Sequence, residues 1–233
     1  MRKHTAPGDK VLDYGLVILH EDRDIIVVDK PAGMNTIPLP HEKERNACSI
    51  LLGYVRKGAA KSRARIFIVH RLDTWTSGAL VFARTEEAMN KLKENWKNTK
   101  KQYLAIVHGK PRKSADTITG YLTESDPYHV QATSNPAEGK LASTAYRVLK
   151  ATKHYSLLEI DLLTGRKHQI RVHLAGIGHP VAGDRKYGKQ DSQPRLMLHS
   201  RSISFDHPHS GKRMTLTAET PAIFKSLVGE FEE

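Results

Sequence analysis

The sequence predicts an α+β fold in which helices and loops flank a mixed, mainly antiparallel β-sheet. Three observations lead to this prediction: apolar stretches of strand length recur along the chain, few segments have helical periodicity, and most predicted strands follow one another directly. Parallel strands need a crossover connection, usually a helix, so strands in direct succession favour antiparallel pairing. The chain has 233 residues, enough for one large domain with a buried core.

The first predicted elements are two short strands within residues 15–29, GLVILHEDRDIIVVD, joined by a turn at residues 20–24. Lys30-Pro31-Ala32-Gly33 then breaks the strand pattern, because proline cannot donate to a ladder and glycine permits a tight turn. Beyond this break we expect a helix within residues 41–60 and strands at residues 65–69 and 79–82.

Residues 85–96 carry the clearest helix signals. Thr85 suits the N-cap, two glutamates follow it at the positive end of the helix dipole, and Met89, Leu92 and Trp96 recur at helical spacing. Further strands are expected at residues 101–107, 143–149, 155–163, 203–205 and 214–217. A third helix is expected to end near Gly176, and a last one to follow Pro221.

The charge of the chain indicates an anionic partner. Lys and Arg total 37 against 25 Asp and Glu, which gives a net charge of +12, and neutralising phosphates with such residues releases counterions. One cysteine, Cys48, excludes an intramolecular disulfide and any multi-cysteine metal site. No apolar run approaches the roughly 20 residues of a membrane-spanning helix, so we expect a cytoplasmic protein with no membrane contact.

Most other site chemistries are not supported by the spacing of the residues. Thirteen histidines invite a metal, but His168 and His173 are five apart, which suits neither a helix face nor a strand face. His207 and His209 could share a strand face, but with only Asp206 nearby they make a poor site. No phosphate-binding loop and no GxSxG elbow are present. We therefore expect no metal and no cofactor.

A single acid on a polar turn, Asp73 in HRLDTWTSG, is the remaining candidate for chemistry. An isolated carboxylate can act as a covalent nucleophile or stabilise a developing cation. A paired arginine would keep it ionised and aimed, and the candidates for that pairing are Arg71 and Arg171.

The segment His70-Arg71-Leu72-Asp73, followed by Thr76-Ser77-Gly78, resembles the central motif of the RluA-type RNA pseudouridine synthases. Four further blocks match in the family's order: VDKPAG at 28–33, KQYLA at 101–105, KLASTAY at 140–146, and TGRKHQIRVHL at 164–174 with GHP at 178–180 and GD at 183–184. HRLD alone would be a weak signal, but five blocks in order are highly specific.

The resemblance implies isomerisation of uridine in RNA, in which the base leaves its nitrogen link to ribose, rotates and returns through carbon. It assigns the nucleophile to Asp73, packing on the flipped base and removal of its C5 proton to Tyr103, and pairing with the acid to Arg171. Whether Asp73 adds to the ribose or removes a ribose proton stays open. On the residues alone, a core tyrosine is the favoured interpretation of Tyr103, and a solvated helix charge is the more common case for a residue such as Arg171.

RNA contacts are expected from several basic residues. We hypothesise that Arg71 fills the space vacated by the flipped base, with a phosphate contact as the alternative role. Backbone contacts are expected from Lys30, Arg166, Lys167 and the basic loop 56–65, with His70, Lys101 and His168 as further RNA-binding candidates. Trp75 could stack on a base or pack internally.

We expect a single catalytic domain over residues 1–233, with a motif-bearing core at about 15–220 around a basic cleft. About 25 residues precede the first motif, too few for a separate N-terminal RNA-binding domain. The expected partner is a stem-loop of ribosomal or transfer RNA, bound by a monomer. A catalytically silent RNA-binding module on the same fold is the alternative; a nucleoside glycosidase is a third reading, which the charge disfavours.

Overall fold

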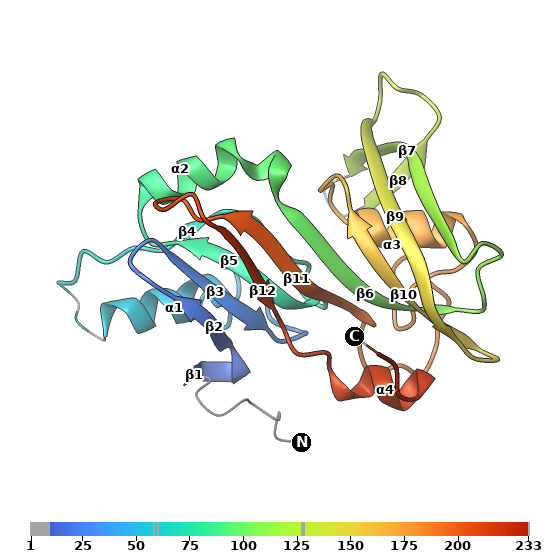
Figure 1. Ribbon diagram of the computed structural model, residues 1–233, viewed down its shortest axis with the longest axis horizontal. Helices are drawn as coiled ribbons and strands as arrows, with labels where there is room; N and C mark the ends of the chain where they lie inside the picture. Colours follow the sequence, from blue (N-terminus) through green and yellow to red (C-terminus); the bar gives the residue numbers. More distant parts are fainter. Residues whose placement is uncertain (1–9, 58, 60, 127–128, 233) are drawn as a thin grey trace. The chain divides into compact units, whose positions relative to one another are not determined.

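The computed structural model describes residues 10–57, 59, 61–126 and 129–232. The chain forms two compact units, a first unit of residues 1–99 with 200–219 and a second unit of residues 100–199 with 220–233. Figure 1 shows helices and strands in both parts of the chain. Each unit combines helices with antiparallel strand pairs, which confirms the predicted α+β class.

The first unit contains seven strands in the residues described, if the part of β11 that lies there is counted. They are β1 (Lys10–Val11), β2 (Val17–Glu21), β3 (Ile25–Lys30), β4 (Phe67–Ile68), β5 (Ser77–Ala83), β11 (Leu198–Asp206) and β12 (Arg213–Thr217). Their order is β1-β2-β3-β5-β11, with β4 pairing β5 and β12 pairing β11. The helices are α1 (Ala47–Arg56) and α2 (Glu86–Glu94).

Strands β3 and β5 are buried along their whole length, which explains the apolar runs at residues 25–28 and 79–83. One face of this strand pair, with Ile25, Val27 and Val81, packs on Ala88 and Leu92 of α2. The predicted N-cap of α2 is confirmed, since the Thr85 hydroxyl accepts from the Ala88 nitrogen at 3.1 Å. The helix is shorter than predicted, because Trp96 lies in a separate 3₁₀ turn, Trp96–Asn98.

The second unit is built on five strands in the described residues, paired antiparallel in the order β6-β10-β9-β7-β8. These are β6 (Lys100–His108), β7 (Ala115–Asp126), β8 (His129–Thr133), β9 (Lys140–Ala151) and β10 (Tyr155–Leu162). Helix α3 (Gln169–Gly176) lies against β8 and β9, and helix α4 (Ala222–Val228) contacts β10 (Figure 1). A small core of Leu122, Val130, Ala142 and Val172 joins α3 to the sheet.

The antiparallel pair β7–β8 was not predicted, because its residues are largely polar and half exposed. In contrast, β6, β10 and β12 lie within about two residues of their predicted positions. Among the helices of the described ranges, none is long and apolar enough to cross a lipid bilayer.

Candidate active site

Asp73 lies on a turn between β4 and β5 of the first unit, and its side chain is half-buried. Hydrogen bonds fix the backbone on its N-terminal side, where the Thr36 hydroxyl donates to the Leu72 oxygen at 2.9 Å and accepts from the Leu72 nitrogen at 3.1 Å. The Asp73 carbonyl accepts from the Thr76 nitrogen at 3.1 Å, which closes the turn. The carboxylate therefore projects from a backbone with little freedom to shift.

Lys30, at the end of β3, fixes the other side of the turn. Its side chain is 0% exposed, and its ammonium donates to the carbonyls of Met34 at 2.7 Å, Pro31 at 3.1 Å and Thr74 at 3.2 Å. An ammonium has three N–H donors, and three backbone acceptors surround this one. The predicted contact between Lys30 and the RNA backbone stays a prediction, which the burial of the side chain and its three backbone acceptors do not favour.

Three residues close to Asp73 in the sequence, His70, Arg71 and Trp75, have different surroundings. The His70 Nε2 accepts from the Val81 nitrogen at 3.1 Å, and the ring lies 4.9 Å from that of Trp96, so His70 ties the turn to β5. Arg71 is exposed, and the Trp75 side chain is 49% exposed. An RNA contact by Arg71 is compatible with its exposure and stays a prediction.

Lys101 and Tyr103 lie on β6 of the second unit. Tyr103 is 6% exposed and stands opposite Ile160 of β10. Because side chains alternate along a strand, Lys101 and Tyr103 point to the same face of this sheet. Burial lowers the pKa of Lys101, and a Cβ added to Gly165 would lie 3.8 Å from its ammonium, so the loop after β10 passes beside it.

Gln169, the first residue of α3, organises the loop that carries Arg166 and Lys167. Its amide nitrogen donates to the Ser143 carbonyl at 3.0 Å and to the Thr144 hydroxyl at 2.9 Å. Its amide oxygen accepts from the Thr164 hydroxyl at 2.7 Å and the Arg166 nitrogen at 3.0 Å. The amide uses its full donor and acceptor capacity, and this anchoring role was not predicted.

Arg171 of α3 forms a bidentate ion pair with Asp184. Its Nε lies 2.7 Å from one carboxylate oxygen and its Nη2 lies 2.8 Å from the other. Asp184 also accepts from the backbone nitrogens of Lys186 and Tyr187. Burial alone would raise the pKa of Asp184, but these hydrogen bonds and the guanidinium outweigh burial and lower the pKa.

Tyr187 completes the surroundings of Arg171. The guanidinium carbon lies 5.0 Å from the centre of the Tyr187 ring, within the range of a cation–π contact. The phenol oxygen accepts from the Val130 nitrogen at 3.1 Å and lies 2.8 Å from the His168 Nδ1. His168, predicted to contact RNA, thus also serves inside the second unit, where it holds a left-handed conformation with φ +52°.

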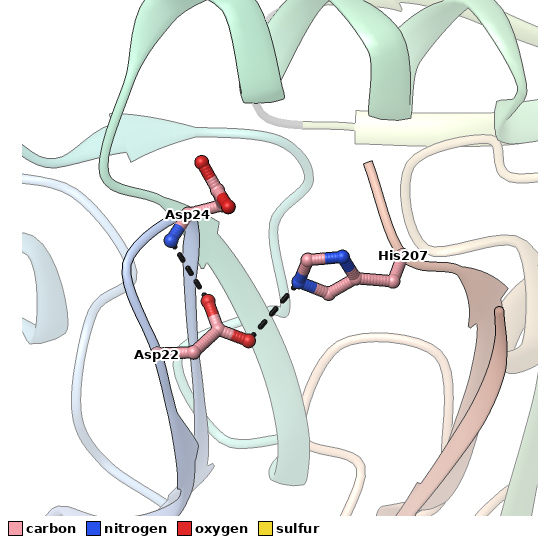
Figure 2. Close-up of side chains that lie close together, drawn as sticks. All are labelled: Asp22, Asp24 and His207. Atoms are coloured by element: carbon pink, nitrogen blue, oxygen red, sulfur yellow. Dashed lines mark hydrogen bonds and ion pairs between the residues drawn. The ribbon is translucent and has the colours of Figure 1, made fainter. Parts of the chain in front are cut away.

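A group of acids and a histidine in the first unit was missed by the sequence analysis. Figure 2 shows the Asp22 carboxylate between the backbone nitrogen of Asp24, at 2.8 Å, and the His207 ring, at 3.0 Å. The His207 Nδ1 accepts from two backbone nitrogens, so the neutral ring carries its hydrogen on Nε2 and donates it to Asp22. Hydrogen bonds therefore account for this cluster, in which a second histidine, His20, also contacts Asp22 at 2.8 Å.

Residues 24–176 of the chain match the family described as RNA pseudouridylate synthase. The match covers more than half of the chain and includes Asp73, Tyr103 and Arg171. The chain belongs to this family. Members of the RNA pseudouridine synthase family are intramolecular isomerases, and the predicted resemblance is confirmed.

Individual relatives agree with this assignment. The chain is 38% identical over 91% of its length to "Ribosomal large subunit pseudouridine synthase D" of Nitrosomonas europaea and spans 64% of that protein. It is 34% identical over 90% of its length to "Dual-specificity RNA pseudouridine synthase RluA" of Escherichia coli and spans 94% of that protein.

Two solved structures confirm the pseudouridine synthase fold. Human RNA Pseudouridylate Synthase Domain Containing 4 has a TM-score of 0.74 at 24% identity, covering 89% of each chain. Human RNA Pseudouridylate Synthase Domain Containing 1 has a TM-score of 0.72 at 25% identity, covering 93% of this chain and 88% of that one.

The predicted catalytic residues of this pseudouridine synthase family member come from both compact units. Asp73 belongs to the first, and Tyr103 and Arg171 belong to the second. The structure adds Asp184 as a partner of Arg171, and the pairing of Arg171 with Asp73 stays a prediction. The GD block at residues 183–184 was the available signal for Asp184, but its chemistry was not assigned from sequence.

Proposed function

We propose that this chain converts specific uridines in a stem-loop of ribosomal or transfer RNA to pseudouridine, with Asp73 as the nucleophile. Family membership supports the reaction, and two relatives, a ribosomal large subunit pseudouridine synthase and a dual-specificity RNA pseudouridine synthase, support the substrate class. The net charge of +12 supports an RNA partner.

The reaction is balanced without a cofactor. The bond between ribose C1′ and uracil N1 breaks, the uracil turns, and a bond forms between C1′ and C5. The proton lost from C5 is matched by the proton that N1 gains. In this proposal Asp73 acts on the ribose, Tyr103 assists removal of the C5 proton, and Arg171 keeps the acid ionised. The chain is proposed to act as one catalytic domain in a monomer.

The observation that carries the proposal is the fixed position of the Asp73 turn. The residue before Asp73 is held by the Thr36 hydroxyl, and the residue after it is held by the Lys30 ammonium. Holding a reacting group in one geometry removes part of the entropic barrier of the reaction, so a rigid turn suits a nucleophile.

The test is pseudouridine mapping by chemical modification of total RNA from cells that lack this gene and carry either wild type or a variant. Wild type and Asp161→Asn, an exposed carboxylate on β10, should restore the same modified uridines. Asp73→Asn, which has nearly the same shape, should restore none. Full restoration by Asp73→Asn would contradict the assigned nucleophile.

Purified protein separates this proposal from the two alternatives. A silent RNA-binding module would bind RNA while the wild type formed no pseudouridine at any site. A nucleoside glycosidase would release free uracil from uridine. Formation of pseudouridine by wild type without release of uracil, together with RNA binding by Asp73→Asn, is the result that the proposal expects.

A further inference from the structure

Trp75 is an exposed tryptophan two residues after the proposed nucleophile. Its side chain is 49% exposed, although tryptophan is among the most buried residue types on average. The chain has only two tryptophans, and the other, Trp96, is half-buried against His70. An exposed indole at this position has no evident role in the core of the first unit.

The indole is nevertheless held in place on one side. A Cβ added to Gly33 would lie 3.3 Å from Cζ3, 3.7 Å from Cη2 and 3.8 Å from Cε3 of Trp75, so the six-membered ring rests on the glycine backbone. Gly33 has φ +83°, which a side chain rarely tolerates, and its nitrogen donates to the Thr74 carbonyl at 2.8 Å. The ring is therefore preorganised, with about half of its surface open to solvent.

The residues around Trp75 match what an unpaired base requires. Bases in single-stranded loops stack on aromatic side chains, and exposed Arg71 of the same segment can contact the phosphates. Two residues of extended chain span at most ~7 Å. Stacked nucleotides of one strand are about 3.4 Å apart, so this distance corresponds to one or two nucleotides from the target.

We propose that Trp75 is a stacking platform for an unpaired base next to the target uridine, and so a determinant of the sequence context that is modified. The inference rests on the proposed function, because it places the target uridine at Asp73. Stacking on Trp75 stabilises the RNA loop with its target exposed. Every base has a π-face, so the platform accepts any base, and differences in stacking strength give it a modest preference for purines at that position.

The binding arm of the test uses fluorescence in the inactive Asp73→Asn background, with the stem-loop RNA identified by pseudouridine mapping. With Trp96→Phe added, Trp75 is the sole tryptophan, and its emission should be quenched as the RNA binds. With Trp75→Phe added instead, the quenching by RNA should be largely lost. Emission of Trp75 that does not change at saturating RNA would overturn the proposal.

The second part of the test measures pseudouridine formation in protein that keeps Asp73, and it compares Trp75→Ala, Trp75→Leu and Trp75→Phe. Trp75→Ala and Trp75→Leu should lower kcat/KM by roughly 5- to 150-fold, the range that base–aromatic stacking implies, mainly through KM. Trp75→Phe should retain most activity. Leucine keeps apolar contact with Gly33 but cannot stack, so high activity of Trp75→Leu would show that Trp75 only packs.

RNA variants identify the partner base. One abasic nucleotide is placed in turn at each position next to the target uridine. At the stacking position, wild type should lose about as much activity as Trp75→Ala loses on intact RNA, and the two changes together should cost no more than either alone. If the losses from the abasic nucleotide and from Trp75→Ala add up at every position tested, no neighbouring base stacks on Trp75 and the proposal is refuted.

Failure of the proposed function would look different. The wild type would then form no pseudouridine at any position, whatever the residue at position 75, and a fluorescence titration with total ribosomal and transfer RNA in place of the mapped stem-loop would report whether RNA reaches the indole. Urea midpoints of the three Trp75 variants, compared with wild type, detect any loss of the folded first unit.

Discussion

Replacing Lys30 with methionine should both destabilise the first unit and impair the reaction. Methionine keeps a similar volume but removes the ammonium that donates to the carbonyls of Pro31, Met34 and Thr74. The Thr74 carbonyl keeps its hydrogen bond from Gly33, so two carbonyls lose their donor. A buried acceptor without a partner costs about 1–3 kcal/mol, so the expected loss is about 2–6 kcal/mol. That is a large share of the roughly 5–15 kcal/mol that stabilise a typical domain.

The assay is urea denaturation followed by tryptophan fluorescence, together with pseudouridine formation measured well below the unfolding midpoint. Lys97→Met, at an exposed lysine of the same unit, is the matched control and should leave both readouts unchanged. Lys30→Met should lower the midpoint and also lower kcat, because the residue after Asp73 is no longer held. An unchanged midpoint would refute the bracing role of Lys30. A lowered midpoint with full kcat would refute its role in positioning Asp73.

Three further predictions concern stability. Asp184→Asn should lower the unfolding free energy by about 3–5 kcal/mol in urea denaturation, because it removes the buried carboxylate that pairs with Arg171, whose side chain is 11% exposed; Asp116→Asn, at a carboxylate whose side chain is 38% exposed, should change little. Burial would raise the pKa of Asp22, but hydrogen bonds from His20 and from backbone nitrogens prevail and lower it from 3.8 to about 2. Asp22 therefore contributes stability above pH 3.8 that is lost as the pH falls towards 2, and Asp22→Asn should flatten the acid limb of a plot of melting temperature against pH. Gly78→Ala should lower the melting temperature, since Gly78 has φ +113° and its Cβ would lie 2.7 Å from the Ser200 nitrogen; Gly53→Ala in α1, with open space around it, should raise it.

The parts of the fold that were predicted correctly have strong local patterns. Residues 25–28 of β3 and 79–83 of β5 are apolar at every position, so these runs are distinct from any loop. Helix α2 has a capping residue, acidic residues in its first turn and an apolar stripe, and all three features act within one segment. Such local signals are consistent with the final packing and can be read before the fold is known.

The hairpin β7–β8 lacks such signals. Its sequence contains Gly120 and many polar residues, and among the side chains of the two strands that the structure describes, only Leu122 and Val130 reach this core of the second unit. Pairing with β9 over eight residue positions, from Ala115 to Leu122, holds β7 in place. Strand preference depends on such neighbours more than on intrinsic propensity, so the single sequence did not reveal it.

The site was predicted in part for similar reasons. The Asp73 motif was identified through family resemblance, since a lone acid has little local signature. Lysines are usually exposed, and nothing in the sequence marks Lys30 as buried. Only the folded chain shows that three carbonyls surround its ammonium. Asp22 and His207 are separated by 185 positions, a distance over which no periodicity connects two residues.

The bidentate pair between Arg171 and Asp184 has a consequence for how salt acts on this protein. The two opposite charges cancel at long range. Arg171 therefore supplies oriented N–H donors without adding to the electrostatic potential far from the protein. Attraction of RNA from a distance must therefore come from exposed lysines and arginines, whose influence fades beyond ~8 Å at physiological ionic strength. Raising the salt concentration should consequently slow the association of the protein with RNA, while the rate of pseudouridine formation within the bound complex stays nearly constant.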